Sequence, residues 1–242
     1  MPYYGYGYGY GGYGLAYSWT YLLVLAGVIV CLIASAKVRS TYNRYSSVRS
    51  MSGMTGAQAA QRILAHAGIR DVQIQHVSGN LTDHYDPREK VLRLSDSVYG
   101  SDSVAAVGVA AHECGHAIQH QRGYVPLRVR GAFVPVANFG SSIAWPLIII
   151  GLMMRGQIIV EIGIICFSFA VIFQLITLPV EFNASGRAMR ILRETGILNS
   201  QELPMTGRVL RAAAMTYVAS AASAILQLLR LIILYGGRRR NE

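Results

Sequence analysis

Long runs of residues without a single charge are the feature that most constrains how this chain can fold. The first, residues 15–36, has 22 residues, enough to cross the apolar core of a bilayer as a helix at about 1.5 Å per residue. Two more, residues 133–154 and 157–179, are separated by only two residues, which predicts a helical hairpin through the membrane. A fourth run, residues 217–235, is weaker because Arg230 interrupts it. The sequence therefore predicts a mainly α-helical integral membrane protein with three or four transmembrane helices.

The charges beside the first apolar run predict its orientation. No Lys or Arg precedes it, whereas Lys37, Arg39, Arg44 and Arg49 follow closely. A cleaved signal peptide would carry positive charge ahead of its apolar core, so we interpret residues 15–36 as a retained anchor. Because positive charge gathers on the cytosolic side, the N-terminus is expected outside and the region after the anchor in the cytosol.

The formal net charge of +10 invites a nucleic-acid-binding interpretation. Much of this charge flanks the apolar runs, as positive-inside charge does, so no nucleic-acid partner is expected. One conflict remains within this topology. If residues 217–235 cross the membrane, the cluster 238–240, which is three arginines, lies outside, against the same rule.

The segment between the first and second apolar runs predicts a small α+β unit. A helix is expected at 56–67, because Thr55 and Gln58 form a capping-box pattern. Three short runs of strand-forming residues predict a small antiparallel sheet, and a second helix should extend from a cap near Ser103 to about Gly123. The strands are expected at 72–77, 81–85 and 90–94.

Within that second helix lies a pattern of two histidines and a glutamate. His112 and His116 are four residues apart, so on a helix both imidazoles can reach one metal ion. Glu113, beside the first histidine, can instead take a proton from a water that attacks a carbonyl group. This is the HExxH pattern of zinc peptidases. A structural alternative, a surface helix with incidental charges, fits poorly because nearly all the neighbouring residues are apolar.

Catalytic zinc needs a third protein ligand and an open fourth position. Four acids are compared: Asp83 and Asp86 near the predicted sheet, Glu161 in the third apolar run, and Glu181 just beyond that run. If the hairpin spans the membrane, Glu181 emerges on the side of His112 and His116, whereas Glu161 should not reach them. Small residues at helical spacing follow Glu181 and would permit close approach to a neighbouring helix.

Five blocks of this sequence, spread over most of residues 50–215, resemble the bacterial YugP-type membrane zinc metallopeptidases. The blocks are Met54-Thr-Gly-Ala57, Asp83-His-Tyr-Asp-Pro87, Val91-Leu-Arg-Leu-Ser95, Ala110-Ala-His-Glu-Cys-Gly-His-Ala-Ile-Gln-His120 and Leu178-Pro-Val-Glu-Phe-Asn-Ala-Ser185.

The resemblance implies a gluzincin-like site with one Zn²⁺ per chain, distantly similar to that of the HtpX and Ste24 membrane peptidases. It further implies that Glu181 is the third ligand and that the membrane is the bacterial cytoplasmic membrane. The relatives carry an acid four residues after this glutamate, where it can orient a ligand histidine. Here that position is Ser185, so the orienting group differs.

Other residues near the motif are assigned by helix geometry and by position. Cys114 is about 200° round the helix from His112 and is expected to pack rather than bind metal. His120 lies on the face of His116 and is interpreted as a helix-end or ligand-supporting residue. Candidate groups for stabilising a transition state are His84, Tyr85 and Arg187. An edge strand within residues 81–94 could bind an extended substrate, and proline at Leu92 should then impair cleavage without removing zinc.

The sequence as a whole predicts a membrane-embedded zinc-dependent metalloendopeptidase with Glu113 as general base. Its expected partners are peptide or protein substrates, membrane proteins among them, and the lipid bilayer. One alternative is a catalytically silent zinc-binding scaffold or adaptor. Another is a channel-like or lipid-organising protein that uses Glu161 and Arg230. The predicted organisation is a disordered Tyr/Gly-rich tail (1–14), the anchor (15–36), a catalytic region (37–132), the membrane hairpin (133–179), a soluble segment with the third-ligand helix (180–216), a candidate fourth membrane helix (217–235) and a basic tail (236–242).

Overall fold

The computed structural model describes residues 11–235 of the chain. The described part contains, in order, α1 (Gly11–Ser46), α2 (Gly56–His66), β1 (Gln73–Val77), β2 (His84–Asp86), β3 (Val91–Ser95), α3 (Asp96–Tyr99), α4 (Val104–Gln121), α5 (Val125–Met153), α6 (Gln157–Glu194) and α7 (Glu202–Tyr235).

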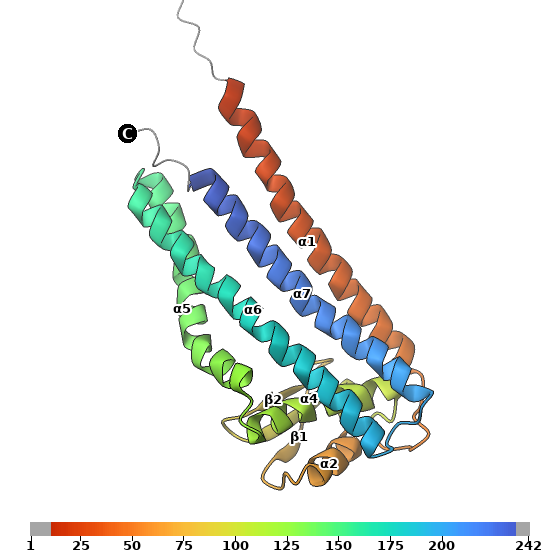
Figure 1. Ribbon diagram of the computed structural model, residues 1–242. Coiled ribbons are helices and arrows are strands. Elements are labelled where there is room, and N and C mark those ends of the chain that lie inside the picture. The colour runs from red at the N-terminus through yellow and green to blue at the C-terminus, as the bar shows by residue number, and fades with distance from the viewer. Residues whose placement is uncertain (1–10, 236–242) are drawn as a thin grey trace, which may run out of the picture.

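Four of these helices, α1, α5, α6 and α7, are long and apolar enough to cross a membrane. Figure 1 shows them running alongside one another, with the short helices and the sheet gathered at one end. Large apolar side chains on their outer surfaces are exposed, which is expected of surfaces that face lipid and not water. Examples are Leu22, Ile33, Met153, Ile158 and Ile165.

Residues 217–235 belong to α7, so the weakest of the four apolar runs also forms a long helix. The charge that interrupts it has a local partner. The guanidinium carbon of Arg230 lies 4.3 Å from the centre of the Tyr21 ring on α1. A cation–π contact of this kind lowers the cost of a charge within an apolar helix.

Two helices extend beyond their apolar runs. Helix α1 begins at Gly11, so residues 11–14 of the predicted disordered tail are helical; the rest of that tail and the basic segment 236–242 lie outside the described residues. Helix α6 is continuous through Pro179. The third apolar run and the predicted third-ligand helix are therefore one helix, and no boundary separates them at residue 180.

Small residues allow α5 and α6 to pack closely as the predicted hairpin. A Cβ at Gly140 would lie 2.7 Å from the carbonyl oxygen of Cys166, and one at Gly163 would lie 2.6 Å from the Ile148 side chain. Helix pairs in membranes gain van der Waals contact in this way, because small residues let their backbones approach. Arg155, at the turn, adopts a positive φ of 53°.

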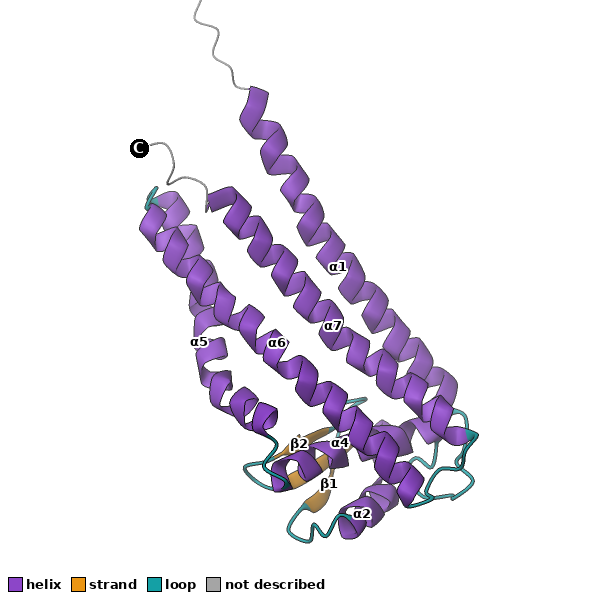
Figure 2. Ribbon diagram, in the orientation of Figure 1, coloured by secondary structure: helices purple, strands orange, loops and turns teal. Residues whose placement is uncertain are grey.

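The sheet has the strand order β1-β3-β2. Figure 2 shows the strands in orange, beside α4 at one end of the long helices. Strands β2 and β3 are antiparallel as predicted, but β1 and β3 are parallel, so an all-antiparallel sheet was wrong. The reason is the loop 78–83, which crosses the end of β3. There the Gly79 N–H donates to the Asp96 carboxylate over 2.8 Å, and the Asp96 N–H donates to the Gly79 carbonyl over 3.1 Å. The chain thus reaches the far edge of β3 before it pairs again.

The sequence signals for α2 and α4 are confirmed by their caps. Thr55 and Gln58 form the capping box of α2. Ser103 Oγ accepts the Ala106 N–H over 3.1 Å at the start of α4, and Gly123, just beyond its end, has a φ of +62°. Most of α4 is buried between α2, α6 and α7. The predicted metal-binding helix is therefore the central element of the soluble end.

Candidate metal centre

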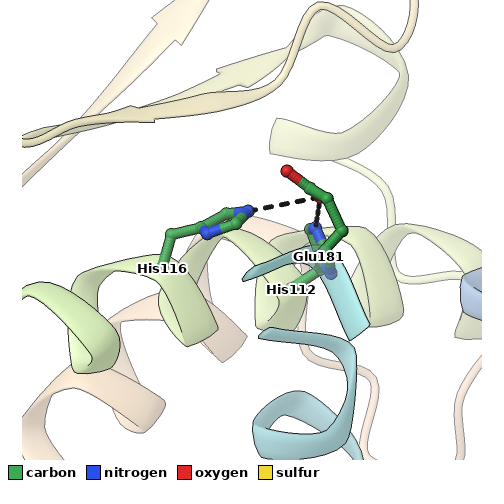
Figure 3. A group of neighbouring side chains, drawn as sticks. All are labelled: His112, His116 and Glu181. Atoms are coloured by element: carbon green, nitrogen blue, oxygen red, sulfur yellow. Dashed lines mark hydrogen bonds and ion pairs between the residues drawn. The ribbon is translucent and has the colours of Figure 1, made fainter. Parts of the chain in front are cut away.

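His112 and His116 project from adjacent turns of α4 toward Glu181 of α6 (Figure 3). Glu181 Oε2 lies 3.3 Å from His112 Nε2 and 3.6 Å from His116 Nε2. The Glu181 side chain is almost fully buried, and one ligand atom from each residue lies within 4.8 Å of the others. The structure therefore brings together the three residues that were predicted to bind metal.

The geometry of this group fits a zinc ion. Ligand atoms at about 2.0–2.1 Å from a tetrahedral zinc lie about 3.3 Å from one another. The two nitrogen–oxygen distances, 3.3 and 3.6 Å, are close to that value. Two imidazole nitrogens and one carboxylate oxygen are also a donor set that catalytic zinc sites use. His112, His116 and Glu181 could thus hold one zinc ion and leave its fourth position open.

The three residues meet because α4 and α6 pack very closely at this level. A Cβ at Gly115 would lie 2.6 Å from the carbonyl oxygen of Ala184, and both Ala184 and Ala188 are fully buried. The small residues after Glu181 thus contact α4, as their spacing predicted. Gly115 is needed between the histidines because any side chain there would push Glu181 away from them.

Hydrogen bonds to the second nitrogen of each imidazole orient the two histidines. The Ser185 hydroxyl lies 3.1 Å from His112 Nδ1. His116 Nδ1 lies 3.0 Å from the Gln119 side-chain carbonyl, whose amide nitrogen donates to Val180 O over 2.8 Å. Since that carbonyl can only accept, Nδ1 of His116 carries the proton. Its Nε2 is then available to bind metal.

Arg130, at the start of α5, was not recognised as a site residue from the sequence. Its Nη1 donates to Glu181 Oε1 over 3.2 Å, which leaves Oε2 directed at the histidines. The sequence signal was ambiguous, because a cation shortly before an apolar run is also typical of positive-inside charge. Arg130 therefore supports the carboxylate that a metal would need.

The other acids that were considered as ligands have different partners. The Asp83 carboxylate accepts from the Ser95 N–H over 2.7 Å and from the Ser95 hydroxyl over 2.9 Å, and burial raises its pKa. Asp86 accepts from two backbone N–H groups in the turn after β2. Glu161 accepts from Gln157 over 3.1 Å, roughly 30 Å along α6 from Glu181 at the helical rise per residue.

Two cavities reach the metal centre. The larger cavity, about 590 Å³, is lined by residues of β2, α4 and α5. The smaller cavity, about 250 Å³, lies among α1, α4, α6 and α7 and is mostly apolar. The residues that line both cavities are Asp83, His112, Glu113, Glu181 and Tyr217. Glu113 thus lines both cavities that reach the ligand group.

The remaining candidates are divided between the larger cavity and its surroundings. His84, Tyr85 and His120 line it, and the Tyr85 hydroxyl lies 2.9 Å from His120 Nδ1. Burial, aided by nearby acids, raises the pKa of Tyr85 to about 12, so its hydroxyl keeps its proton near neutrality. Arg187 instead donates to Asn183 over 2.7 Å and lies over the Tyr124 ring.

Two further residues complete the account of the site. Tyr217 lines both cavities but was not identified from the sequence, where it is simply the first residue of an apolar run. Cys114 is fully buried, and its Sγ lies 3.7 Å from Ala60 O of α2. Burial also raises the pKa of its thiol well above the usual value. The buried position against α2 agrees with the packing interpretation.

The fold and the site together define a class: a helical protein with four helices of membrane-spanning length and a His-His-Glu metal centre at one end of them. The chain belongs to the family described as "Putative neutral zinc metallopeptidase", whose profile matches residues 20–236. It is 47% identical over 221 residues to the "Putative membrane protease YugP" of Bacillus subtilis (strain 168), which covers 90% of this chain and 98% of that protein. No solved structure matches it. These matches confirm the resemblance that the five sequence blocks indicated, and the family implies zinc.

Proposed function

We propose that this protein is a zinc-dependent metalloendopeptidase that hydrolyses peptide bonds at the membrane surface. The observation that carries the proposal is the group of His112, His116 and Glu181, whose spacing fits zinc. Glu113 lies beside it and faces both cavities. A purely structural zinc would need neither an open position nor an adjacent base.

The residues of the site divide the chemistry among them. A zinc ion held by the three ligands would supply the Lewis acidity that activates water and polarises a carbonyl group. Glu113 accepts a proton from the attacking water and passes it to the nitrogen of the leaving amine. Ser185 and Gln119 keep the imidazoles oriented, and Arg130 holds the Glu181 carboxylate in place.

Transition-state stabilisation requires a donor where negative charge develops on the substrate oxygen. Tyr217 is the strongest candidate because its side chain borders both cavities and its hydroxyl interacts with Glu181 in the ligand group. His84 also faces the larger cavity, with Nδ1 2.9 Å from the Thr82 carbonyl. Tyr85 is already bonded to His120. Arg187 is the weakest candidate, since its guanidinium is held against Asn183 and Tyr124.

An extended peptide would occupy both cavities, with its scissile bond between Glu113 and the ligand group. Strand β2 lies at an edge of the sheet and borders the larger cavity, so main-chain pairing with a substrate is available there. Leu92 is not on that edge. It lies in the central strand β3 and is fully buried, so proline there would disrupt the whole sheet rather than only substrate pairing.

The alternatives are less well supported. A silent scaffold would not require Glu113 between two cavities. For a channel-like or lipid-organising protein, Glu161 and Arg230 would have to serve transport, yet each has a local partner, Gln157 and Tyr21 respectively. The peptidase proposal accounts for more of the site than either alternative.

The proposal is tested with protein purified in detergent, by measuring bound metal and cleavage of a peptide library. We expect Glu113→Gln to retain about one zinc per chain and to lose cleavage, because the ligands stay and the base is removed. Glu181→Ala should lose zinc. Glu161→Gln, which removes an acid from the far end of the same helix, serves as the control. Equal cleavage by the wild type and Glu113→Gln would refute the mechanism, and stoichiometric zinc in Glu181→Ala would refute the ligand set.

A further inference from the structure

Helices α1 and α7 form a cleft of about 400 Å³ that has no part in the proposed catalysis. Four cations line it, and the other lining residues are uncharged. The cations are Lys37 and Arg44 of α1 and Arg208 and Arg211 of α7; the uncharged residues are Thr41, Tyr45, Ala212 and Met215. This basic cleft therefore presents four positive charges and no negative charge.

The four cations are not neutralised within the molecule. None of them forms an ion pair with a carboxylate among residues 11–235, whereas Arg49 and Arg130 do. Two of them are held by a neutral group instead. Arg208 Nη1 donates to the Tyr45 hydroxyl over 2.9 Å, and the Arg44 guanidinium lies 5.6 Å from the centre of the same ring. Like charges that line one cleft repel one another, so an anion between them would be stabilising.

The position of the cleft along the helices indicates which anion. Lys37 directly follows the apolar run 15–36, and Arg211 lies six residues before the run 217–235. These positions place the cleft at the level where the membrane ends. The end of α1 and the start of α7 lie beside the soluble unit (Figure 1). Lipid phosphate groups lie at this level, and the guanidinium fork matches phosphate oxygens well. Exposed apolar residues lie at the cleft and in the adjoining apolar run of α1: Met215 lines the cleft, and Ile33 lies four residues before Lys37.

We propose that the basic cleft binds the headgroup of an anionic phospholipid. The phosphate lies between the cations of α1 and α7, and the acyl chains run along the exposed apolar surfaces of the same two helices. The bound lipid joins α1 to α7, the helix that also carries Tyr217 to the metal centre. The positive charge of the cleft matches a phosphate group, and the cleft lies at the membrane boundary. A lipid is favoured over a soluble phosphate compound because only the lipid has acyl chains that can contact the adjoining apolar surface.

The test is a lipid titration of the full-length protein after lipid removal in detergent. Dioleoylphosphatidylglycerol and dioleoylphosphatidylcholine are added separately, and bound lipid is counted by native mass spectrometry. We expect the anionic lipid to bind at least about tenfold more tightly than the zwitterionic one, and less tightly at high salt. Lys37→Gln/Arg211→Gln should weaken its binding by roughly tenfold or more. This pair is chosen because neither side chain donates a hydrogen bond within residues 11–235, so folding should be preserved.

The matched control is Arg70→Gln/Arg88→Gln, which removes the same charge from exposed positions of the soluble unit and should leave lipid binding unchanged. A second variant, Arg44→Gln, covers the case in which the double variant fails to fold. Equal binding of the two lipids would overturn the proposal, as would equal loss of binding in the cleft and control variants. Inorganic phosphate that binds as tightly as the lipid would also overturn it, by showing a site for free phosphate.

Discussion

Ser185 occupies the position at which the distant relatives place an acid, and its hydroxyl still reaches the histidine. It lies 3.1 Å from His112 Nδ1. A hydroxyl can accept the Nδ1 proton and so fix the same tautomer as a carboxylate would. It supplies no negative charge, so it raises the basicity of the imidazole less. The zinc ligand is thus oriented by a weaker partner in this chain.

We therefore expect Ser185→Ala to weaken zinc binding by roughly 10- to 100-fold, the range found when such supporting groups are removed. Competition with a fluorescent chelator measures the change. Ser185→Asp should bind zinc at least as tightly as the wild type. The control is Ser168→Ala, whose hydroxyl bonds to Ile164 O within the same helix. Unchanged zinc affinity in Ser185→Ala would show that the contact does not support the ligand.

For Tyr217 we predict an effect on the rate of cleavage and none on the zinc content. If its hydroxyl stabilises the developing oxyanion, Tyr217→Phe should lower kcat by roughly 100- to 1000-fold. Zinc content should not change, since the three ligands remain. Tyr99→Phe, on the surface of the soluble unit, is the matched control. A change in KM alone would instead assign Tyr217 to substrate binding.

At the residue level, the sequence predicted what local spacing determines. His112, Glu113 and His116 lie within one stretch of helix, so their geometry follows from helical periodicity alone. Glu181 required the resemblance to a family in addition to the hairpin argument. Arg130 and Tyr217 come from two other helices, and only tertiary packing brings them to the site. No periodic pattern marks such residues.

At the level of elements, the contact between α4 and α6 determines whether a metal centre exists. A Cβ at Gly115 would lie 2.6 Å from Ala184 O, which is backbone and cannot move aside easily. Gly115→Ala should therefore cost about 1–3 kcal/mol of stability and also weaken zinc binding, because Glu181 is displaced. Thermal unfolding and zinc titration measure the two effects.

The matched control for that prediction is Gly186→Ala, on the same helix as Glu181. A Cβ there would meet no atom within 4 Å, so alanine should be neutral or stabilise the helix by about 0.5–1 kcal/mol. If the two variants behave alike, close packing at Gly115 is not what positions the site.

For the sheet, the sequence predicted the positions of the strands but not the direction in which β1 and β3 pair. Turn residues and alternating patterns located all three strands approximately, and the hairpin between β2 and β3 follows from the turn at Asp86. The parallel pairing of β1 and β3 depends on the loop 78–83 passing over the end of β3. That path is fixed by contacts between Gly79 and Asp96, far apart in the sequence, which local patterns do not contain.

At the level of the whole molecule, the soluble unit and the turn between α5 and α6 lie at opposite ends of the apolar helices (Figure 1). We expect the soluble unit in the cytosol, because the basic residues after the first apolar run lie beside it. In a background without native cysteines, Met154→Cys at the turn should react with an impermeant maleimide in intact cells. Met51→Cys, 83% exposed on the soluble unit, should react only after permeabilisation. The reverse pattern would invert the orientation.

The side of the membrane on which the C-terminus lies depends on whether α7 crosses the membrane. It packs against α1 along its length, from the Arg208–Tyr45 hydrogen bond at one end to the Arg230–Tyr21 contact at the other. If α1 crosses the membrane, this packing predicts that α7 crosses beside it in the opposite direction. Residue 241, outside the described residues, should then be on the outer side.

The packing of α7 and the positive-inside rule predict opposite sides for the C-terminus. If α7 crosses, the three arginines before residue 241 lie outside, where that rule does not expect them. We expect packing to prevail, since the ends of α1 and α7 that we expect in the cytosol carry the larger basic group, the four residues of the basic cleft. Asn241→Cys should therefore be labelled in intact cells, as Met154→Cys is. Labelling that requires permeabilisation would mean that α7 does not cross, and the contacts between α1 and α7 would then have to be formed by a helix that re-enters on the cytosolic side.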